Sequence, residues 1–308
     1  MKKVLVVVIL GIILTGVLLV LNPKKKSQGI VLGTSVNNFY LEKSVKIHKY
    51  PQKDPLAKDP NILAASAILI DAKTKYPMYE KDSEKAVPIA SVTKVMTAVL
   101  VLENYKLDDV VTVTKDQIEI NGSKAFLKEG EKITVENLLY CMLMVSGNDA
   151  AKTLATYKYS EDDFVAMMNK KAEDLGLTNT HFMDPVGLND EGKSSARDIA
   201  ILFSYALGKD EFTKVVSTAE KDVTSTDGTT THNLKNSNRL TTGEIPMEGI
   251  IGGKTGFTPD AGHTLVSSAQ KGDNRVVGVV LNTYSTTASA SAEEMKKLLT
   301  YGLEAYTF

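Results

Sequence analysis

Strand-like segments lie at both ends of the folding part of this chain, and helical segments lie between them. ILAASAILID from Ile62 and the following YPMYEKD, separated by a turn at 73–75, are typical of a β-hairpin. Three later runs, 249–257, 264–269 and 275–282, are typical of strands. This order predicts an α+β fold in which the N-terminal hairpin and the C-terminal strands form one antiparallel sheet, packed with helices and joined to a mostly helical subdomain.

The middle of the chain contains the helical patterns. The segment 90–105 is apolar nearly all round, so we expect a helix buried in the centre of the domain. A second helix is expected over 134–144 and ends just before Ser146. S-x-x-D/E capping boxes predict three more helix starts, at Ser160 with Asp163, Ser195 with Asp198, and Ser291 with Glu294.

The N-terminus predicts a membrane segment and a tether ahead of the domain. Residues 1–26 contain an uncharged apolar run from Val4 to Leu21, flanked by lysines, whose 18 residues span roughly 27 Å as a helix, close to the thickness of a bilayer core. No small-x-small cleavage site follows, so an uncleaved anchor at 4–21 is favoured over a cleaved signal. Residues 27–60 hold three prolines among lysines and read as a tether, which leaves 61–308 as the catalytic domain.

Composition excludes several classes of protein. The single cysteine, Cys141, rules out an intramolecular disulfide, and four histidines without ligand spacing argue against a metal site, so we expect neither metal nor cofactor. The net charge is −1, and no Lys/Arg run is long enough to follow a phosphate backbone. Nucleic acid is therefore not an expected partner.

Three short motifs carry the chemistry. They are SVTK at 91–94, SGN at 146–148 and KTG at 254–256. A second S-x-x-K match, Ser268 to Lys271, lies in a predicted strand, where positions i and i+3 face opposite sides of the sheet. Only the first match stands at a helix start, where the two positions share a face, so it is the one we retain.

The first motif supplies a nucleophile and its base. Ser91 needs a group that removes its proton, and Lys94, one turn further on, does so only as the neutral amine. Burial of the helix and a second cation, Lys254, are both expected to lower the pKa of Lys94.

The other two motifs supply a proton relay and substrate contacts. Ser146 is expected to pass a proton to the leaving nitrogen, and Asn148 to hold the peptide chain of the substrate. A strand that carries KTG aligns an extended peptide, with Lys254 and Thr255 facing a carboxylate. Gly256 lets the backbone and the substrate approach closely.

From about Ala64 to the C-terminus the sequence resembles the serine D-alanyl-D-alanine carboxypeptidases, the low-molecular-weight penicillin-binding proteins. The resemblance rests on IASVTKVMTAVLVLE, LLYCMLMVSGNDAA, NSNRL and GGKTGFTPDAGHTLV, and the three motifs are those of β-lactamases and penicillin-binding proteins. It implies a β-lactamase/transpeptidase-like fold, an oxyanion hole from the backbone amides of Ser91 and Phe257, and Arg239 of NSNRL as a helper at the substrate carboxylate.

The resemblance also implies substrate, partners and location. The enzyme would remove the terminal D-alanine from peptidoglycan stem pentapeptides ending in D-Ala-D-Ala and would bind β-lactam antibiotics covalently. It would work outside the cell, on the outer face of the cytoplasmic membrane if residues 4–21 stay uncleaved, or secreted if they are cleaved.

Three other functions share part of this pattern. A class A-like β-lactamase shares all three motifs, but its E-x-x-L-N string is absent, and the corresponding loop reads FMDPVGLNDEG. A nucleotide-binding P-loop in GIIGGKT fails on spacing, because Gly249 and Gly253 enclose three residues rather than four. A catalytically idle penicillin-binding or sensor domain is disfavoured by the intact motifs.

Overall fold

The computed structural model describes residues 50–285, 287 and 289–308. The apolar run at 4–21 and the predicted tether up to residue 49 lie outside the described residues. Among the residues it does describe, no helix combines the length and the apolar character needed to cross a bilayer. The described residues belong to one compact unit that begins at Lys49.

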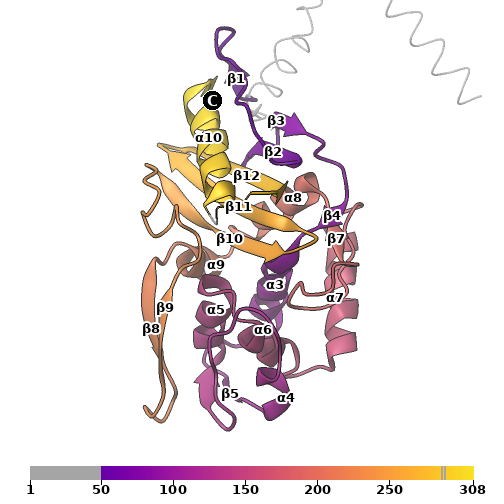
Figure 1. Cartoon of the computed structure of the whole chain (residues 1–308), viewed down its shortest axis with the longest axis vertical. Coiled ribbons are helices and arrows are strands. Elements are labelled where there is room, and N and C mark those ends of the chain that lie inside the picture. Colours follow the sequence, from indigo (N-terminus) through magenta and orange to yellow (C-terminus); the bar gives the residue numbers. More distant parts are fainter. Residues whose placement is uncertain (1–49, 286, 288) are drawn as a thin grey trace, which may run out of the picture. The chain divides into compact units, whose positions relative to one another are not determined.

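A five-stranded sheet joins the two ends of this unit. Its order is β10-β11-β12-β2-β3, and every neighbouring pair is antiparallel (Figure 1). The N-terminal hairpin pairs with the C-terminal strands through β2 and β12, which confirms the predicted architecture. The five strands are β2 Ser66–Asp71, β3 Pro77–Lys81, β10 Ile250–Thr258, β11 Gly262–Lys271 and β12 Asn274–Thr283.

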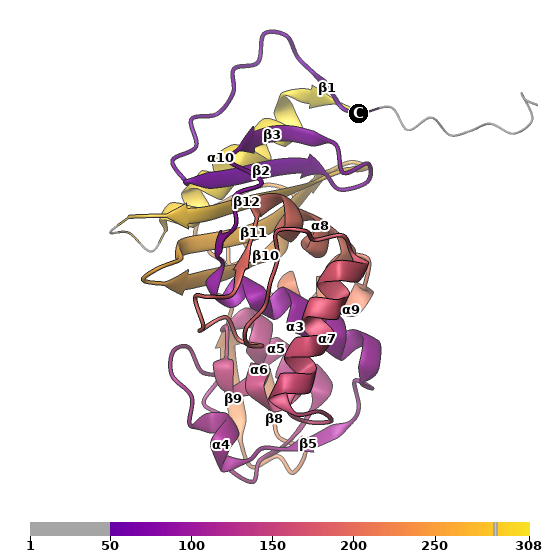
Figure 2. The same ribbon diagram turned by 90° about the vertical axis from the view of Figure 1, so that its right-hand side faces the viewer.

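Both faces of the sheet are covered, because its central strands are apolar on both sides. Along β2, Ala67 and Leu69 pack into one apolar cluster and Ile68 and Ile70 into the other. Helix α10 (Ala290–Glu304) covers the first face, and α8 (Ala196–Ala206) packs on the second (Figures 1 and 2). The alternation follows from the two-residue period of a strand.

The second cluster of apolar side chains continues into a helical lobe below the sheet (Figure 2). At its centre lies α3, whose first eight residues are all buried, as the all-round apolar pattern predicts. The helices of the lobe are α3 Lys94–Asn104, α4 Lys115–Ile118, α5 Val135–Met144, α6 Asn148–Ala155, α7 Glu161–Asp174 and α9 Asp210–Val216, and the 3-10 helix η1, Ala90–Thr93, precedes α3.

Short two-stranded pairings complete the unit. Three of them are separate from the five-stranded sheet: β4 Val87–Pro88 with β7 Lys193–Ser194, β5 Val110–Thr112 with β6 Lys132–Thr134, and β8 Glu220–Thr224 with β9 Thr231–Lys235.

The fourth pairing places the start of the folded domain earlier in the chain than the sequence predicts. β1 (Gln52–Lys53) pairs with β13 (Tyr306–Thr307), and Asp59 accepts a hydrogen bond from Tyr301 Oη at 2.6 Å. Residues 50–60, expected in the tether, are thus packed against the C-terminal helix. Backbone pairing across more than 250 residues leaves no local sequence signal, which is why the boundary at 61 differs from the structure.

Two of the three predicted helix starts form, with the serine as the N-cap residue. Ser160 and Ser195 accept from the backbone N–H of Asp163 and Asp198, as expected. The third prediction is wrong, because α10 begins at Ala290, one residue before Ser291. Glu294 is buried and accepts instead from the backbone N–H of Leu63 at 2.6 Å, so its carboxylate ties the helix to the chain ahead of β2.

Candidate active site

The three motifs converge on one cavity of about 560 Å³ between the helical lobe and the edge of the sheet. Ser91 comes from η1, Ser146 from the turn between α5 and α6, and Asn148 from the first position of α6. Thr255 and Gly256 come from edge strand β10. The two motif lysines lie fully buried beneath it. Of the predicted site residues, those that line the cavity are Ser91, Ser146, Asn148, Arg239, Thr255, Gly256 and Phe257.

A tight turn presents Ser91 to the cavity. Ala90, directly before it, has a φ of +48°, a left-handed conformation that is strained for a residue with a side chain. Gly187 packs against this turn so closely that a Cβ there would lie 2.0 Å from the Ala90 carbonyl oxygen. The loop at 184–190 therefore packs directly against the strained turn through Gly187.

Ser91 and Lys94 meet as the motif spacing predicts, with one difference in the helix type. The first turn, Ala90–Thr93, is a 3-10 helix rather than an α-helix, and in that geometry positions i and i+3 eclipse each other. Lys94 Nζ lies 2.8 Å from Ser91 Oγ.

The surroundings of Lys94 favour a neutral amine. Its Nζ also lies 2.7 Å from Asn148 Oδ1 and 2.7 Å from the carbonyl oxygen of Val186. Burial, reinforced by the neighbouring charge of Lys254, lowers the pKa of Lys94 well below its usual value. As a neutral amine, Lys94 donates its two N–H groups to these two oxygens and keeps its lone pair for the Ser91 hydroxyl.

Lys254 and Ser146 form the second contact beneath the cavity. Lys254 Nζ donates to Ser146 Oγ at 3.0 Å and to the carbonyl oxygen of Thr255 at 2.7 Å. Burial lowers the pKa of Lys254 to about 7. Ser146 itself has a φ of +60°, so a strained backbone again aims a motif hydroxyl at the site.

Asn148, which is expected to hold the substrate, also contacts protein groups through both ends of its amide. Its Oδ1 accepts from Lys94, and its Nδ2 donates to the carbonyl oxygen of Asn121 at 2.6 Å. Gly122 lies so close that a Cβ there would sit 2.7 Å from Asn148 Nδ2. Both ends of the amide therefore face protein groups and hold the base in place, and its contact with the substrate stays a prediction.

The KTG strand runs directly beside the nucleophile. A Cβ on Gly256 would lie 2.9 Å from the Ser91 nitrogen and 3.0 Å from the carbonyl oxygen of Ile89, so glycine is required at this crossing. This close approach brings the start of η1 against the segment that carries Phe257. It is consistent with an oxyanion hole formed by backbone amides of both segments. The Phe257 ring is 58% exposed, and its centroid lies 4.6 Å from that of His263.

The loop after β9 adds a group that the sequence reasoning missed. Ser237 lines the cavity, and its Oγ lies 2.6 Å from Thr255 Oγ1. Arg239, two residues on, also lines the cavity, so hydroxyl groups and a cation are available where a carboxylate is expected. Ser237 lies inside the quoted NSNRL string, and only the tertiary contact with Thr255 distinguishes it.

The carboxylates near the cavity are occupied elsewhere. Asp184 accepts from the backbone N–H groups of Val186, Gly187, Leu188 and Asn189 and so folds the loop over Lys94. Among the described residues that line the cavity, none is an aspartate or a glutamate. No carboxylate is thus placed there to activate a water molecule.

Other chemistry is not assembled among the described residues. They contain no group of three His, Cys, Asp or Glu side chains that could hold a metal ion. Cys141 is buried, and burial raises the pKa of its thiol above the usual range, which suppresses the reactive thiolate.

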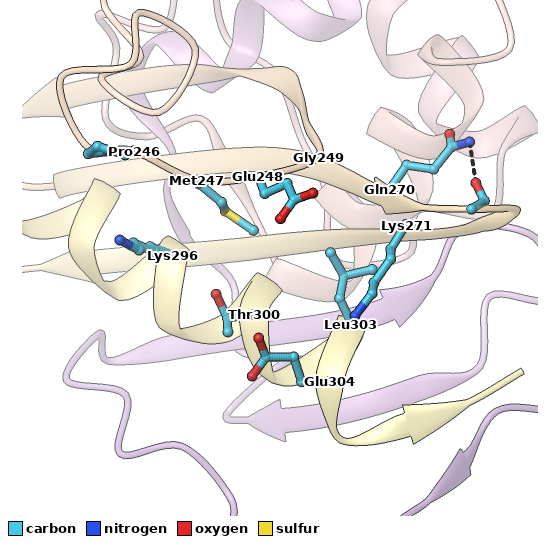
Figure 3. Close-up of a pocket in the computed structure, with 11 residues that line it drawn as sticks. Pro246, Met247, Glu248, Gly249, Gln270, Lys271, Lys296, Thr300, Leu303 and Glu304 are labelled. Atoms are coloured by element: carbon cyan, nitrogen blue, oxygen red, sulfur yellow. Dashed lines mark hydrogen bonds between the residues drawn. The ribbon is translucent and has the colours of Figure 1, made fainter.

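A second cavity, of about 550 Å³, lies between α10 and the ends of β10 and β11 (Figure 3). Its lining combines apolar side chains such as Met247 and Leu303 with the charged Glu248, Lys271 and Lys296. It holds no serine, cysteine or histidine, so it lacks a nucleophile paired with a base, and the motif cavity remains the candidate active site.

Comparisons with known proteins find one family over most of the chain. A profile of the D-alanyl-D-alanine carboxypeptidase family, peptidase S11, matches residues 53–285. The chain is 36% identical to D-alanyl-D-alanine carboxypeptidase DacF of Bacillus subtilis over 250 residues, 79% of this chain and 63% of DacF. It is 32% identical to the D-alanyl-D-alanine endopeptidase of Pseudomonas aeruginosa, with 82% of each chain covered.

A solved structure matches over nearly its whole length. The Streptomyces K15 DD-transpeptidase aligns with a TM-score of 0.73 at 32% identity, over 80% of this chain and 99% of that one. The expected β-lactamase/transpeptidase-like fold is thereby confirmed. The chain spans less than two thirds of DacF, so DacF contains a part that this chain does not match.

Proposed function

The chain belongs to the D-alanyl-D-alanine carboxypeptidase family, and from that membership we propose that it removes the terminal D-alanine from peptidoglycan stem pentapeptides ending in D-Ala-D-Ala. One observation carries the proposal: Lys94 Nζ lies 2.8 Å from Ser91 Oγ in the cavity that the other two motifs also line. A serine beside a buried amine is the arrangement that serine acyl transfer requires.

Acylation follows from the contacts around Ser91. Neutral Lys94 takes the Ser91 proton as Oγ attacks the carbonyl carbon of the penultimate D-alanine, and the oxygen charge develops beside the amides of Ser91 and Phe257. The C–N bond then breaks, and the terminal D-alanine leaves as an amine that takes a proton through Ser146. Water cleaves the Ser91 ester in a second step and restores the hydroxyl.

β-Lactams enter the same first step. Ser91 opens the lactam amide and stays acylated. Deacylation of this adduct is expected to take minutes or longer, because no carboxylate lines the cavity among the described residues. Rapid repeated hydrolysis of a chromogenic cephalosporin would favour the β-lactamase alternative instead.

Attachment to the outer face of the cytoplasmic membrane is the remaining part of the proposal. The support is the uncharged run Val4–Leu21, which is long enough to span a bilayer as a helix. Fractionation of cells expressing the full chain should recover it with membranes. A mature form that begins after residue 22 and is free of membrane would show that the run is a cleaved signal.

The activity test uses a pentapeptide ending in D-Ala-D-Ala and mass spectrometry of the products. The full chain should release one D-alanine, and Ser91→Ala should release none and take up no fluorescent penicillin. Labelling of Ser91→Ala would contradict the assignment of the nucleophile. A wild type that is labelled by penicillin but leaves the peptide intact would favour an idle penicillin-binding domain.

A further inference from the structure

Two buried asparagines hydrogen-bond to the backbone of the loop that carries Arg239, which lines the cavity. Asn236 Oδ1 accepts from the backbone N–H of Asn238, and Asn238 Oδ1 accepts from that of Leu240. Both asparagines are buried, with 5% and 0% of their surface exposed. The backbone under Arg239 is thus fixed, while its own side chain is 42% exposed.

The same loop turns back and brings a carboxylate to Arg239. The backbone N–H of Ile245 donates to the carbonyl oxygen of Arg239 at 3.0 Å, which closes the turn. Glu244 therefore stands beside the guanidinium, with Oε2 3.3 Å from Arg239 Nη1. Its other oxygen, Oε1, lies 2.8 Å from Lys235 Nζ at the end of β9.

The three side chains form a row with one free end. Lys235 lowers the pKa of the Glu244 carboxyl, so Glu244 stays ionised near neutral pH. Glu244 in turn forms an ion pair with Nη1 of Arg239, and a guanidinium has five N–H donors, so donors remain for a second acceptor. The row carries two positive charges and one negative charge, so its net charge still attracts an anion.

We propose that Glu244 is a positioning residue that holds Arg239 ready for the terminal carboxylate of the substrate. The inference rests on the proposed function, because a substrate that ends in D-Ala-D-Ala brings a free carboxylate to the part of the cavity lined by Arg239, Ser237 and Thr255. An unrestrained arginine loses side-chain entropy when it binds, and a side chain already held in place loses less. Glu244 therefore raises the affinity for peptides with a free C-terminal carboxylate, without contacting the substrate.

The test measures binding rather than turnover. In the Ser91→Ala background, calorimetry compares a peptide ending in D-Ala-D-Ala with the same peptide carrying a C-terminal amide. Glu244→Gln should weaken binding of the acid by about 3- to 10-fold, the effect of one immobilised side chain, and leave binding of the amide unchanged. In an Arg239→Gln background the Glu244 change should have no further effect.

The matched control is Glu248→Gln. Glu248 lies four residues further along, is exposed and lines the second cavity rather than the active site (Figure 3). This control should leave both affinities unchanged. Tighter binding of the acid by Glu244→Gln would show that Glu244 competes with the substrate, and equal losses for acid and amide would show a merely structural role.

Failure of the proposed function and failure of the positioning role give different experimental results. If the wild type binds the acid peptide in preference to the amide but does not cleave it, the proposed function fails and the role of Glu244 is still decided by the binding ratios. If the Ser91→Ala protein shows no preference for the acid, the positioning role of Glu244 is overturned.

Discussion

The buried lysines of the active site and the buried histidine of the β8–β9 hairpin have opposite electrostatic surroundings. Lys94 and Lys254 are fully buried, and each bonds only to uncharged oxygen atoms. His232 Nε2 lies 2.8 Å from Glu131 Oε1, a carboxylate whose side chain is 1% exposed. Burial lowers the pKa of both lysines, and at Lys94 it outweighs the opposing charges of Asp184 and Asp149. The hydrogen-bonded Glu131 carboxylate instead raises the pKa of His232.

This difference separates the groups that take part in the reaction from the groups that stabilise the fold around them. Glu131 also accepts from the backbone N–H of Lys128, and Asp149 accepts from those of Ala125 and Leu127, so compensated carboxylates fold the loop that leads from the cavity wall. That loop includes Ser123, which lines the cavity. The two lysines, which no carboxylate contacts directly, lie where a proton must move, and burial there favours their neutral amines.

Among variants that test this contrast, Lys94→Arg should have the largest effect, on the rate of acylation. Arginine keeps the charge but offers no neutral amine at accessible pH, so acylation should slow by at least ~100-fold, the low end for a lost general base. The rate of labelling by fluorescent penicillin measures this directly. Acylation at a near-normal rate would remove Lys94 from the role of base.

Lys254→Met tests the energetic cost of the unpaired site. An unfolded lysine holds its proton up to about pH 10.4, whereas folded Lys254 releases it at about pH 7. The unfolded state therefore binds more protons across this window, and the free energy of unfolding should rise with pH by up to a few kcal/mol in the wild type relative to Lys254→Met. Urea unfolding at pH 7, 8.5 and 10 measures the difference. Parallel curves for the two proteins would contradict the lowered pKa.

His232→Gln tests the compensated site and should act with the opposite pH dependence. The raised pKa means that folding favours protonated His232, so its contribution is complete below about pH 6.5, the value for the unfolded chain, and falls as pH rises through the folded pKa. The variant should lose about 1–3 kcal/mol of stability, more at pH 5.5 than at pH 8.5. Unfolding by urea at the two pH values decides, and a loss that does not depend on pH would assign His232 a packing role only.

Glu131→Gln should give the smallest effect of the four. The amide keeps the shape and removes the charge, its oxygen still accepts from the Lys128 N–H, and its NH2 group donates to the Nε2 of a neutral His232. We therefore expect about 1 kcal/mol of lost stability and a His232 pKa that returns toward its usual value. NMR titration of the His232 ring follows that pKa. Penicillin acylation should stay within about 2-fold of the wild type, because the active-site lysines keep their surroundings; a larger loss would show that the two buried sites are coupled.

Local patterns in the sequence determine the elements and the order of the chemical groups. The alternation in SAILID, the all-round apolar helix after Ser91 and the three-residue spacing of Ser91 and Lys94 depend on contacts within one turn or one strand. For the same reason the decoy at Ser268 is recognised from its strand alone. These predictions agree with the structure because the interactions that produce them are short-range.

The tertiary structure decides what surrounds each group. Lys94 meets Asn148 across 54 residues and Val186 across 92, and Lys254 meets Ser146 across 108. The contact of Asn148 with Lys94 and that of Ser237 with Thr255 form only when these distant segments pack together. A pKa depends on burial and on nearby charge, and both are set by parts of the chain that lie far apart in the sequence. The residue types in the three motifs therefore indicate the reaction, and the packing of distant segments gives Lys94 the lowered pKa that a base requires.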